Sequence, residues 1–154
     1  MRIVIRTVER VSNRTPTEFV KWLCEALGLA EGEENAKALD QQILEKLIVA
    51  SRLDTGITSS EIGKKEGIAR STVIYHLNRL INTGLVTKRG RKYYLRAMDV
   101  ASTIKEIEYD IDREFSRIHD AAQEFDRVLI EQMREMQNKK KMQKGGFGNV
   151  KRKE

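Results

Sequence analysis

Cysteine and proline each occur once in this chain of 154 residues, and histidine occurs twice. The single thiol, Cys24, cannot form a disulfide within the chain, which favours a cytoplasmic protein. One cysteine and two separated histidines, His76 and His119, cannot supply the four ligands of a tetrahedral metal site. These residues form no recognisable catalytic set, and no glycine-rich phosphate loop is present. We therefore expect a protein that is not an enzyme and that needs no cofactor or metal.

Long hydrophobic runs are missing as well. No apolar segment approaches the roughly 20 residues that span a membrane, and residues 1–11 are too polar for a signal peptide. Hydrophobic residues still make up 40% of the chain. That is enough for one folded domain with an appendage. We expect a soluble protein with no membrane segment.

Acidic residues are absent from one long stretch. None occurs between Glu66 and Asp99, although the chain contains 23. Residues 57–97 carry nine basic and two acidic side chains, whereas residues 98–137 carry five basic and eleven acidic ones. Residues 138–154 are basic again, with seven basic side chains and one acidic side chain. Because carboxylates repel a polyanion, the first and third of these blocks are the candidates for binding one.

The first third of the chain shows one weak strand pattern and two helical patterns. Arg2–Arg6 alternates and is β-branched, which predicts a short strand. Thr15 and Pro16 begin a helix that Gly28 ends. A second helix is predicted from about residue 36 to residue 53, because apolar residues recur along one side of it.

A short helix, a turn and a longer helix follow. Thr58 and Glu61 form the pattern of a capping box at the start of the short helix, and Gly67 ends it. The predicted elements after the turn are a helix over residues 70–83 and a hairpin of two strands, 85–88 and 92–95.

The outer face of the helix over residues 70–83 contains no acid. At 100° per residue, Val73, Leu77 and Leu80 form its core-facing stripe. His76 lies beside that stripe and is interpreted as a packed residue. The outer face, rich in hydrogen-bonding and basic groups, suits the major groove of DNA, where a carboxylate would face phosphates. Its residues are Ser71, Thr72, Ile74, Tyr75, Asn78, Arg79 and Asn82.

The segment TSSEIGKKEGIARSTVIYHLNRLINTGLVTKRGRKYYL, residues 58–95, resembles the winged helix-turn-helix DNA-binding family in its ArsR/MarR-like branch. The resemblance covers about residues 36–95. It implies a mainly α fold with a small β-hairpin wing, followed by a long C-terminal coiled-coil helix. Residues 58–65 would be the positioning helix, 70–83 the recognition helix and 86–94 the wing.

The resemblance also implies roles for individual residues. Ala69 departs from the pattern, because this position often holds a Ser or Thr cap; Ser71 would therefore either cap the helix or read a base. Base-reading residues would be Ser71, Thr72, Ile74, Tyr75 and Asn78. Residues on the phosphate backbone would be Thr58, Ser59, Arg70, Arg79 and Asn82. The wing, in the minor groove or on the backbone, would contribute Lys88, Arg89, Arg91 and Lys92.

From about residue 97 to residue 137, a helical pattern carries a hydrophobic seam with heptad spacing. Only Glu108 and Gln132 are polar among its eleven positions from Ala101 to Met136. Such a seam is typical of a coiled coil, and we expect a homodimer through residues 97–137. Packing against the helix of residues 15–27 is the alternative. The predicted dimer interface consists of Ile104, Ile111, Phe115, Ile118, Ala122, Phe125 and Leu129.

These patterns divide the chain into four parts. The parts are an N-terminal strand and helix extension (1–35), a winged helix-turn-helix domain (36–96), a dimerisation helix (97–137) and a basic disordered tail (138–154). The predicted function is that of a homodimeric transcriptional regulator that binds double-stranded DNA. Two alternatives stay open: a basal or protein-interaction factor that contacts the transcription machinery, and an architectural protein that binds DNA without sequence preference.

Overall fold

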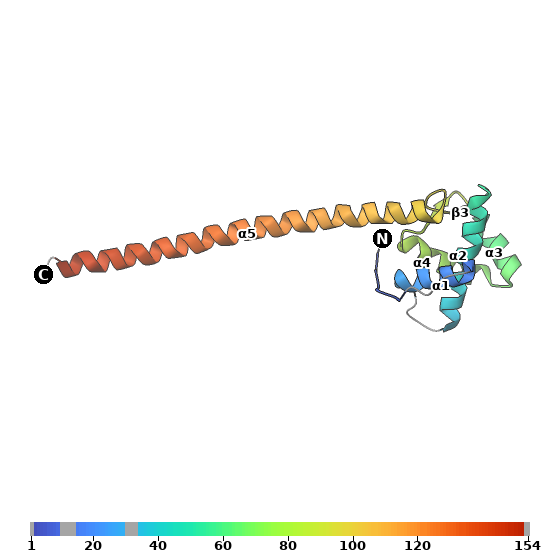
Figure 1. Ribbon diagram of the computed structural model, residues 1–154, viewed down its shortest axis with the longest axis horizontal. Coiled ribbons are helices and arrows are strands. Elements are labelled where there is room, and N and C mark those ends of the chain that lie inside the picture. The colour runs from blue at the N-terminus through green and yellow to red at the C-terminus, as the bar shows by residue number, and fades with distance from the viewer. Residues whose placement is uncertain (1, 10–14, 30–33, 153–154) are drawn as a thin grey trace. The chain divides into compact units, whose positions relative to one another are not determined.

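The computed structural model describes residues 2–9, 15–29 and 34–152, with side chains as far as Lys144. Residues 1–111 form one compact unit and residues 112–154 form a second (Figure 1). The elements in chain order are α1 (Pro16–Ala26), α2 (Glu34–Arg52), β1 (Ile57–Thr58), α3 (Ser59–Glu66), α4 (Arg70–Asn82), β2 (Val86–Arg89), β3 (Lys92–Leu95) and α5 (Val100–Arg152).

Helix α2 is the centre of the first unit, since α1, α4 and β3 all pack against it (Figure 1). Its residues Ile43, Leu44 and Leu47 are fully buried. The same core takes in side chains from α3, α4 and the sheet, including Ile62 and Leu77. Burial of these apolar side chains holds the helices and the sheet together as one folded domain.

The helix starts predicted at Thr15 and Thr58 are confirmed. The Thr15 hydroxyl accepts a hydrogen bond from the Glu18 amide at the start of α1. Thr58 and Glu61 form a reciprocal capping box at the start of α3. Gly67 then ends α3 in a left-handed conformation, with φ at 67°. These local hydrogen bonds satisfy backbone groups that a helix end leaves without partners.

The predicted hairpin is also confirmed, and a third strand joins it. Strands β2 and β3 pair antiparallel, with Arg89 opposite Lys92 next to the turn. The short strand β1 pairs with the other edge of β3, which gives the order β1-β3-β2. The domain is thus mainly helical, with a small three-stranded antiparallel sheet, in a winged helix-turn-helix arrangement.

The first turns of α5 belong to the compact unit. Asp99 caps the helix, because its Oδ1 accepts a hydrogen bond of 2.7 Å from the Ser102 amide. This bond lowers the pKa of Asp99. Thr103 and Ile107 are buried, and Arg96 forms a salt bridge to the mostly buried Asp110. Helix α5 therefore starts three residues later than the sequence pattern indicated.

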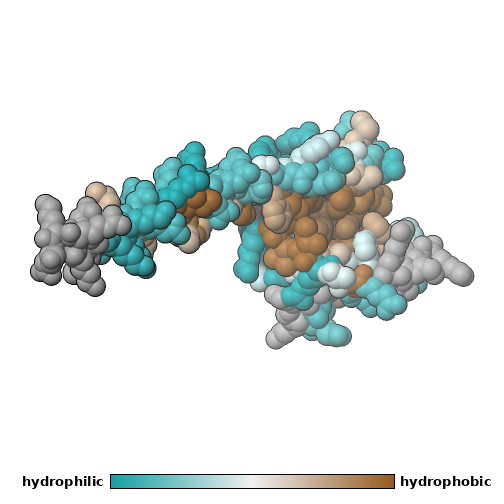
Figure 2. Space-filling view, turned by 60° about the vertical axis from the view of Figure 1, so that its left-hand side comes forward, coloured by the Kyte–Doolittle hydropathy of each residue, from teal (hydrophilic) through white to brown (hydrophobic). Residues whose placement is uncertain are grey.

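Every described side chain from residue 112 to residue 144 is exposed. The exposed residues include the seam positions Phe115, Ile118, Phe125 and Leu129. Figure 2 shows a hydrophobic patch on this helix among hydrophilic residues, as well as hydrophobic residues gathered on one face of the compact unit. Among the described residues, no helix combines the length and the apolar composition needed to cross a membrane.

The strand predicted over Arg2–Arg6 is wrong, because residues 2–9 form no regular element. None of the described strands pairs with them. The Arg2 amide instead donates to the carbonyl of Asn82, and the Arg6 amide donates to the carbonyl of Ala26. Both carbonyls lie in the last turn of a helix, where intrahelical partners run out. The segment thus satisfies the C-terminal ends of α4 and α1.

The helix end predicted at residue 137 is not seen, and residues 138–152 of the predicted tail lie in helix α5. Helix α5 continues to Arg152. The lysine-rich run from Lys139 to Lys144 contains residues of high helix propensity and no proline. Its lack of hydrophobic periodicity therefore does not interrupt the helix.

Candidate nucleic-acid interface

Helix α4 turns one face to the core and the other to solvent, as its sequence predicts. Val73, Leu77 and Leu80 are fully buried. On the outer face, Ser71, Tyr75 and Asn78 are exposed, while Thr72 and Ile74 are half-buried beside them. The five predicted base-reading residues thus share the exposed side of one helix.

Ser71 does not cap α4. The cap position is Ala69, and no side chain makes the cap hydrogen bond. Ser71 is instead exposed, so the predicted cap role is not seen and its contact with a base stays a prediction. The first turn of α4 consequently presents backbone N–H groups without a side-chain cap.

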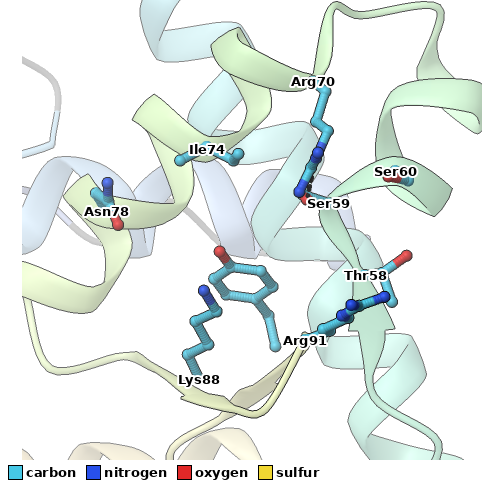
Figure 3. Close-up of a pocket in the computed structure, with 9 residues that line it drawn as sticks. Thr58, Ser59, Ser60, Arg70, Ile74, Asn78, Lys88 and Arg91 are labelled. Atoms are coloured by element: carbon cyan, nitrogen blue, oxygen red, sulfur yellow. Dashed lines mark hydrogen bonds between the residues drawn. The ribbon is translucent and has the colours of Figure 1, made fainter.

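A groove separates the outer side of α4 from the wing. It has a volume of about 630 Å³. Figure 3 shows side chains from three parts of the fold around this space. The lining residues are Thr58, Ser59 and Ser60 at the start of α3, Arg70, Ile74 and Asn78 of α4, and Lys88, Arg91 and Tyr93 of the wing. We call this the wing groove.

The wing groove is strongly cationic. The Arg70 guanidinium donates a weak hydrogen bond of 3.4 Å to the Ser59 hydroxyl, and the Lys88 ammonium lies 5.6 Å from the centre of the Tyr93 ring. Over the described part of the chain, neither of these cations nor Arg91 forms an ion pair with an acid. Three basic groups with no acidic partner, beside hydroxyl and amide groups, suit a ligand with closely spaced negative charges.

The predicted wing residues divide into two pairs. Lys88 and Arg91 line the wing groove. Arg89 lies over the ring of Tyr94, with 4.9 Å between the guanidinium carbon and the ring centre, and lines a different groove. Lys92 donates to the carbonyl of Thr55 on a third surface. Only the first pair faces α4.

Arg79 is engaged by a buried carboxylate that sequence reasoning missed. The Arg79 Nε donates to Asp40 Oδ2 at 3.2 Å, and His76 Nδ1 lies 2.7 Å from Asp40 Oδ1. Asp40 is fully buried, and His76 is buried as expected. Partial burial lowers the pKa of Arg79, but Asp40 and Tyr75 more than offset this and raise it. Asp40 follows the spacing of the apolar stripe of α2, and this is the signal that could have found it.

The predicted dimer interface falls in both units. Ile104 and Ile111 are half-buried against the core of the same chain. The other predicted interface residues are exposed within the second unit; they are Phe115, Ile118, Ala122, Phe125 and Leu129.

The fold is a winged helix-turn-helix, and the cationic wing groove lies between α3, the outer side of its helix α4 and the wing. A model of the winged helix-turn-helix DNA-binding family matches residues 38–87. This segment contains most of α2, all of α3 and α4, and the start of the wing. The match supports the general class and does not single out its ArsR/MarR-like branch. Searches of curated proteins and of solved structures found no match.

Proposed function

We propose that this protein is a transcriptional regulator that binds duplex DNA as a homodimer. The observation that carries the proposal is the wing groove beside the exposed face of α4, in which Arg70, Lys88 and Arg91 have no acidic partner among the residues that the structure describes. In DNA-binding proteins of this architecture, a recognition helix enters the major groove and adjacent basic groups bind the backbone.

Each part of the site has a role in this proposal. The exposed hydroxyl and amide groups of Ser71, Tyr75 and Asn78 read base edges, and Ile74 contacts a thymine methyl group. Arg70, Lys88 and Arg91 bind phosphates. Thr58 and Ser59, at the start of α3, line the wing groove together with Arg70 and approach the same backbone.

The homodimer follows from the hydrophobic seam of the second unit. Phe115, Ile118, Phe125 and Leu129 recur at heptad spacing and are exposed. A second copy of the same helix presents a complementary stripe, as in a coiled coil. Two identical domains would then bind two half-sites related by two-fold symmetry.

The first experiment is selection of duplexes from a random library at about 150 mM salt. Enrichment of a palindromic sequence supports a specific dimeric regulator. Retention without enrichment would favour an architectural protein, and no retention would favour a protein-interaction factor. If about six phosphates are neutralised per dimer, the slope of log affinity against log salt is about −5. Tight binding with a slope near zero would contradict the phosphate contacts.

Asn78 and Arg91 separate base reading from backbone binding. We expect Asn78→Ala to relax discrimination by about 1–3 kcal/mol at one base pair per half-site, because an amide can bond two groups of one base. Arg91→Ala is the matched control, and it should weaken binding to all sequences by nearly the same factor. Competition titrations with single-base variants of the selected duplex measure both effects. If neither variant alters binding, α4 and the wing are not the interface.

A further inference from the structure

The N-terminal segment, residues 2–9, contacts the C-terminal end of the recognition helix α4 through Arg2. The Arg2 amide donates a hydrogen bond of 3.0 Å to the Asn82 carbonyl at the end of α4. Val4 lies over Gly28, where an added Cβ would come within 2.8 Å of the Val4 Cβ. Gly28 also has a φ of 74°, a conformation that glycine adopts without strain. The segment is therefore held in place by a backbone hydrogen bond to α4 and by the close contact of Val4 with Gly28.

A second groove lies where this segment meets α4. Its volume is about 210 Å³, and it contains two arginines, Arg2 and Arg79. We call it the N-terminal groove. Its other lining residues are Val4, Leu27, Gly28, Leu29, Asn82 and Thr83, none of which is acidic.

The two arginines of the N-terminal groove differ in their surroundings. The charge of Arg79 is partly compensated by Asp40, which accepts from its Nε. Arg2 is exposed, and within the described ranges its guanidinium takes part in no ion pair or side-chain hydrogen bond. Arg2 is thus the cation of this groove that is available to an anionic ligand.

The two grooves lie on opposite flanks of the base-reading face. At 100° per residue, Tyr75, Asn78 and Asn82 fall within about 40° of Ser71 around the axis of α4. The wing groove begins on one side of this stripe, with Arg70 and Ile74 about 100° and 60° away in one direction. The N-terminal groove extends on the other side, with Arg79 and Thr83 about 80° and 120° away in the opposite direction.

This arrangement matches the geometry of the major groove. The groove is about 12 Å wide and is bordered by one phosphate backbone on each side. A helix inserted in it therefore meets phosphates on both flanks. The wing groove supplies cations for one backbone, and the N-terminal groove is placed to supply them for the other.

We propose that Arg2 contacts a backbone phosphate of duplex DNA, on the strand opposite the one held by the wing groove. This inference rests on the proposed function and assigns a role to the N-terminal segment. Backbone hydrogen bonding to Asn82 fixes Arg2 at the end of the reading face. Arg79, held by Asp40, forms the inner wall of the site.

The test is a salt titration of the full-length protein on the selected duplex, followed by fluorescence anisotropy. We expect Arg2→Ala to make the slope of log affinity against log salt shallower by about 2 per dimer, since each protomer loses one phosphate contact. The same loss should appear on an unrelated duplex, because a phosphate contact carries no sequence information. Arg2→Lys keeps the charge and should retain most of the slope.

Two further variants serve as references. Arg6→Ala removes a basic group from the same segment outside the N-terminal groove, and it should leave the slope unchanged. Arg91→Ala, in the wing groove, should make the slope shallower. If Arg91→Ala reduces the slope and Arg2→Ala does not, the second flank carries no phosphate contact and this inference is overturned while the proposed function stands. If the wild-type protein retains no duplex, both are overturned. Unchanged thermal unfolding of Arg2→Ala excludes a loss caused by misfolding.

Discussion

Gly63 of α3 lies against the turn of the helix-turn-helix. A Cβ at this position would lie 2.7 Å from the carbonyl oxygen of Ile68, which is a backbone atom and cannot rotate away. The same turn is closed by a hydrogen bond of 2.9 Å from the Ile68 amide to the Gly63 carbonyl. A side chain here would therefore force α3 and the turn apart.

We expect Gly63→Ala to lower the free energy of unfolding by about 1–3 kcal/mol, the usual cost of overpacking a buried contact. Urea unfolding followed by circular dichroism measures the loss. Gly67→Asn is the matched control, because Asn tolerates a positive φ and, among the described residues beyond its own part of the chain, no heavy atom lies within 4 Å of the Cβ position. Equal losses in the two variants would contradict the steric explanation.

At the scale of elements, Asp40 joins the central helix to the recognition helix. His76 and Arg79 lie three residues apart on α4, and their side chains bond the two oxygens of this one carboxylate. A carboxylate only accepts hydrogen bonds, so Nδ1 of His76 is the donor. The two bonds add directional contacts to the apolar packing between α2 and α4, and they orient the side of α4 that carries Arg79.

We expect Asp40→Ala to reduce the free energy of unfolding by about 1.5–3 kcal/mol, because it removes hydrogen bonds to charged groups and leaves His76 buried without its partner. Chemical denaturation provides the measurement. Gln42→Ala, at an exposed position of the same helix, should change stability by less than about 0.5 kcal/mol. A similarly small effect of Asp40→Ala would show that packing alone fixes α4.

At the scale of the whole molecule, the main feature is the exposed hydrophobic seam of the second unit. Its helix has a hydrophobic seam and no buried side chain among residues 112–144. An isolated helix gains little stability in water, and most helices owe theirs to packing of an apolar face. Two copies paired along the seam would bury these side chains and supply that packing.

We expect Leu129→Glu to convert the proposed dimer to a monomer and to reduce helix content, since it places two charges in the seam. Sedimentation equilibrium and circular dichroism report the two changes. Ile130→Glu alters a residue of comparable exposure that lies 100° around the helix, off the seam, and should leave the dimer intact. A wild-type protein that sediments as a monomer, or equal effects of the two variants, would rule out this interface.

Much of the fold was predictable because its signals are local. Three signals act over a few residues each: the Thr58–Glu61 capping box, the C-cap glycine Gly67 that ends α3, and the hydrophobic period of α4. They specify where helices begin and end, and which side of α4 faces the core. The same locality explains the error over Arg2–Arg6, because alternation within five residues does not show whether another strand pairs with them.

The sequence by itself therefore determined the helical elements, the hairpin and the acid-free face of α4. Only the tertiary structure decided which residues far apart in the chain meet around this face of α4. It placed Asp40 against Arg79, and Arg2 at the end of α4. It also placed Lys88 and Arg91 on the wing groove, with Arg89 and Lys92 on other surfaces. The physical reason is that these contacts join residues far apart in the chain, whose distances depend on how the elements pack and not on the period or propensity of any one segment.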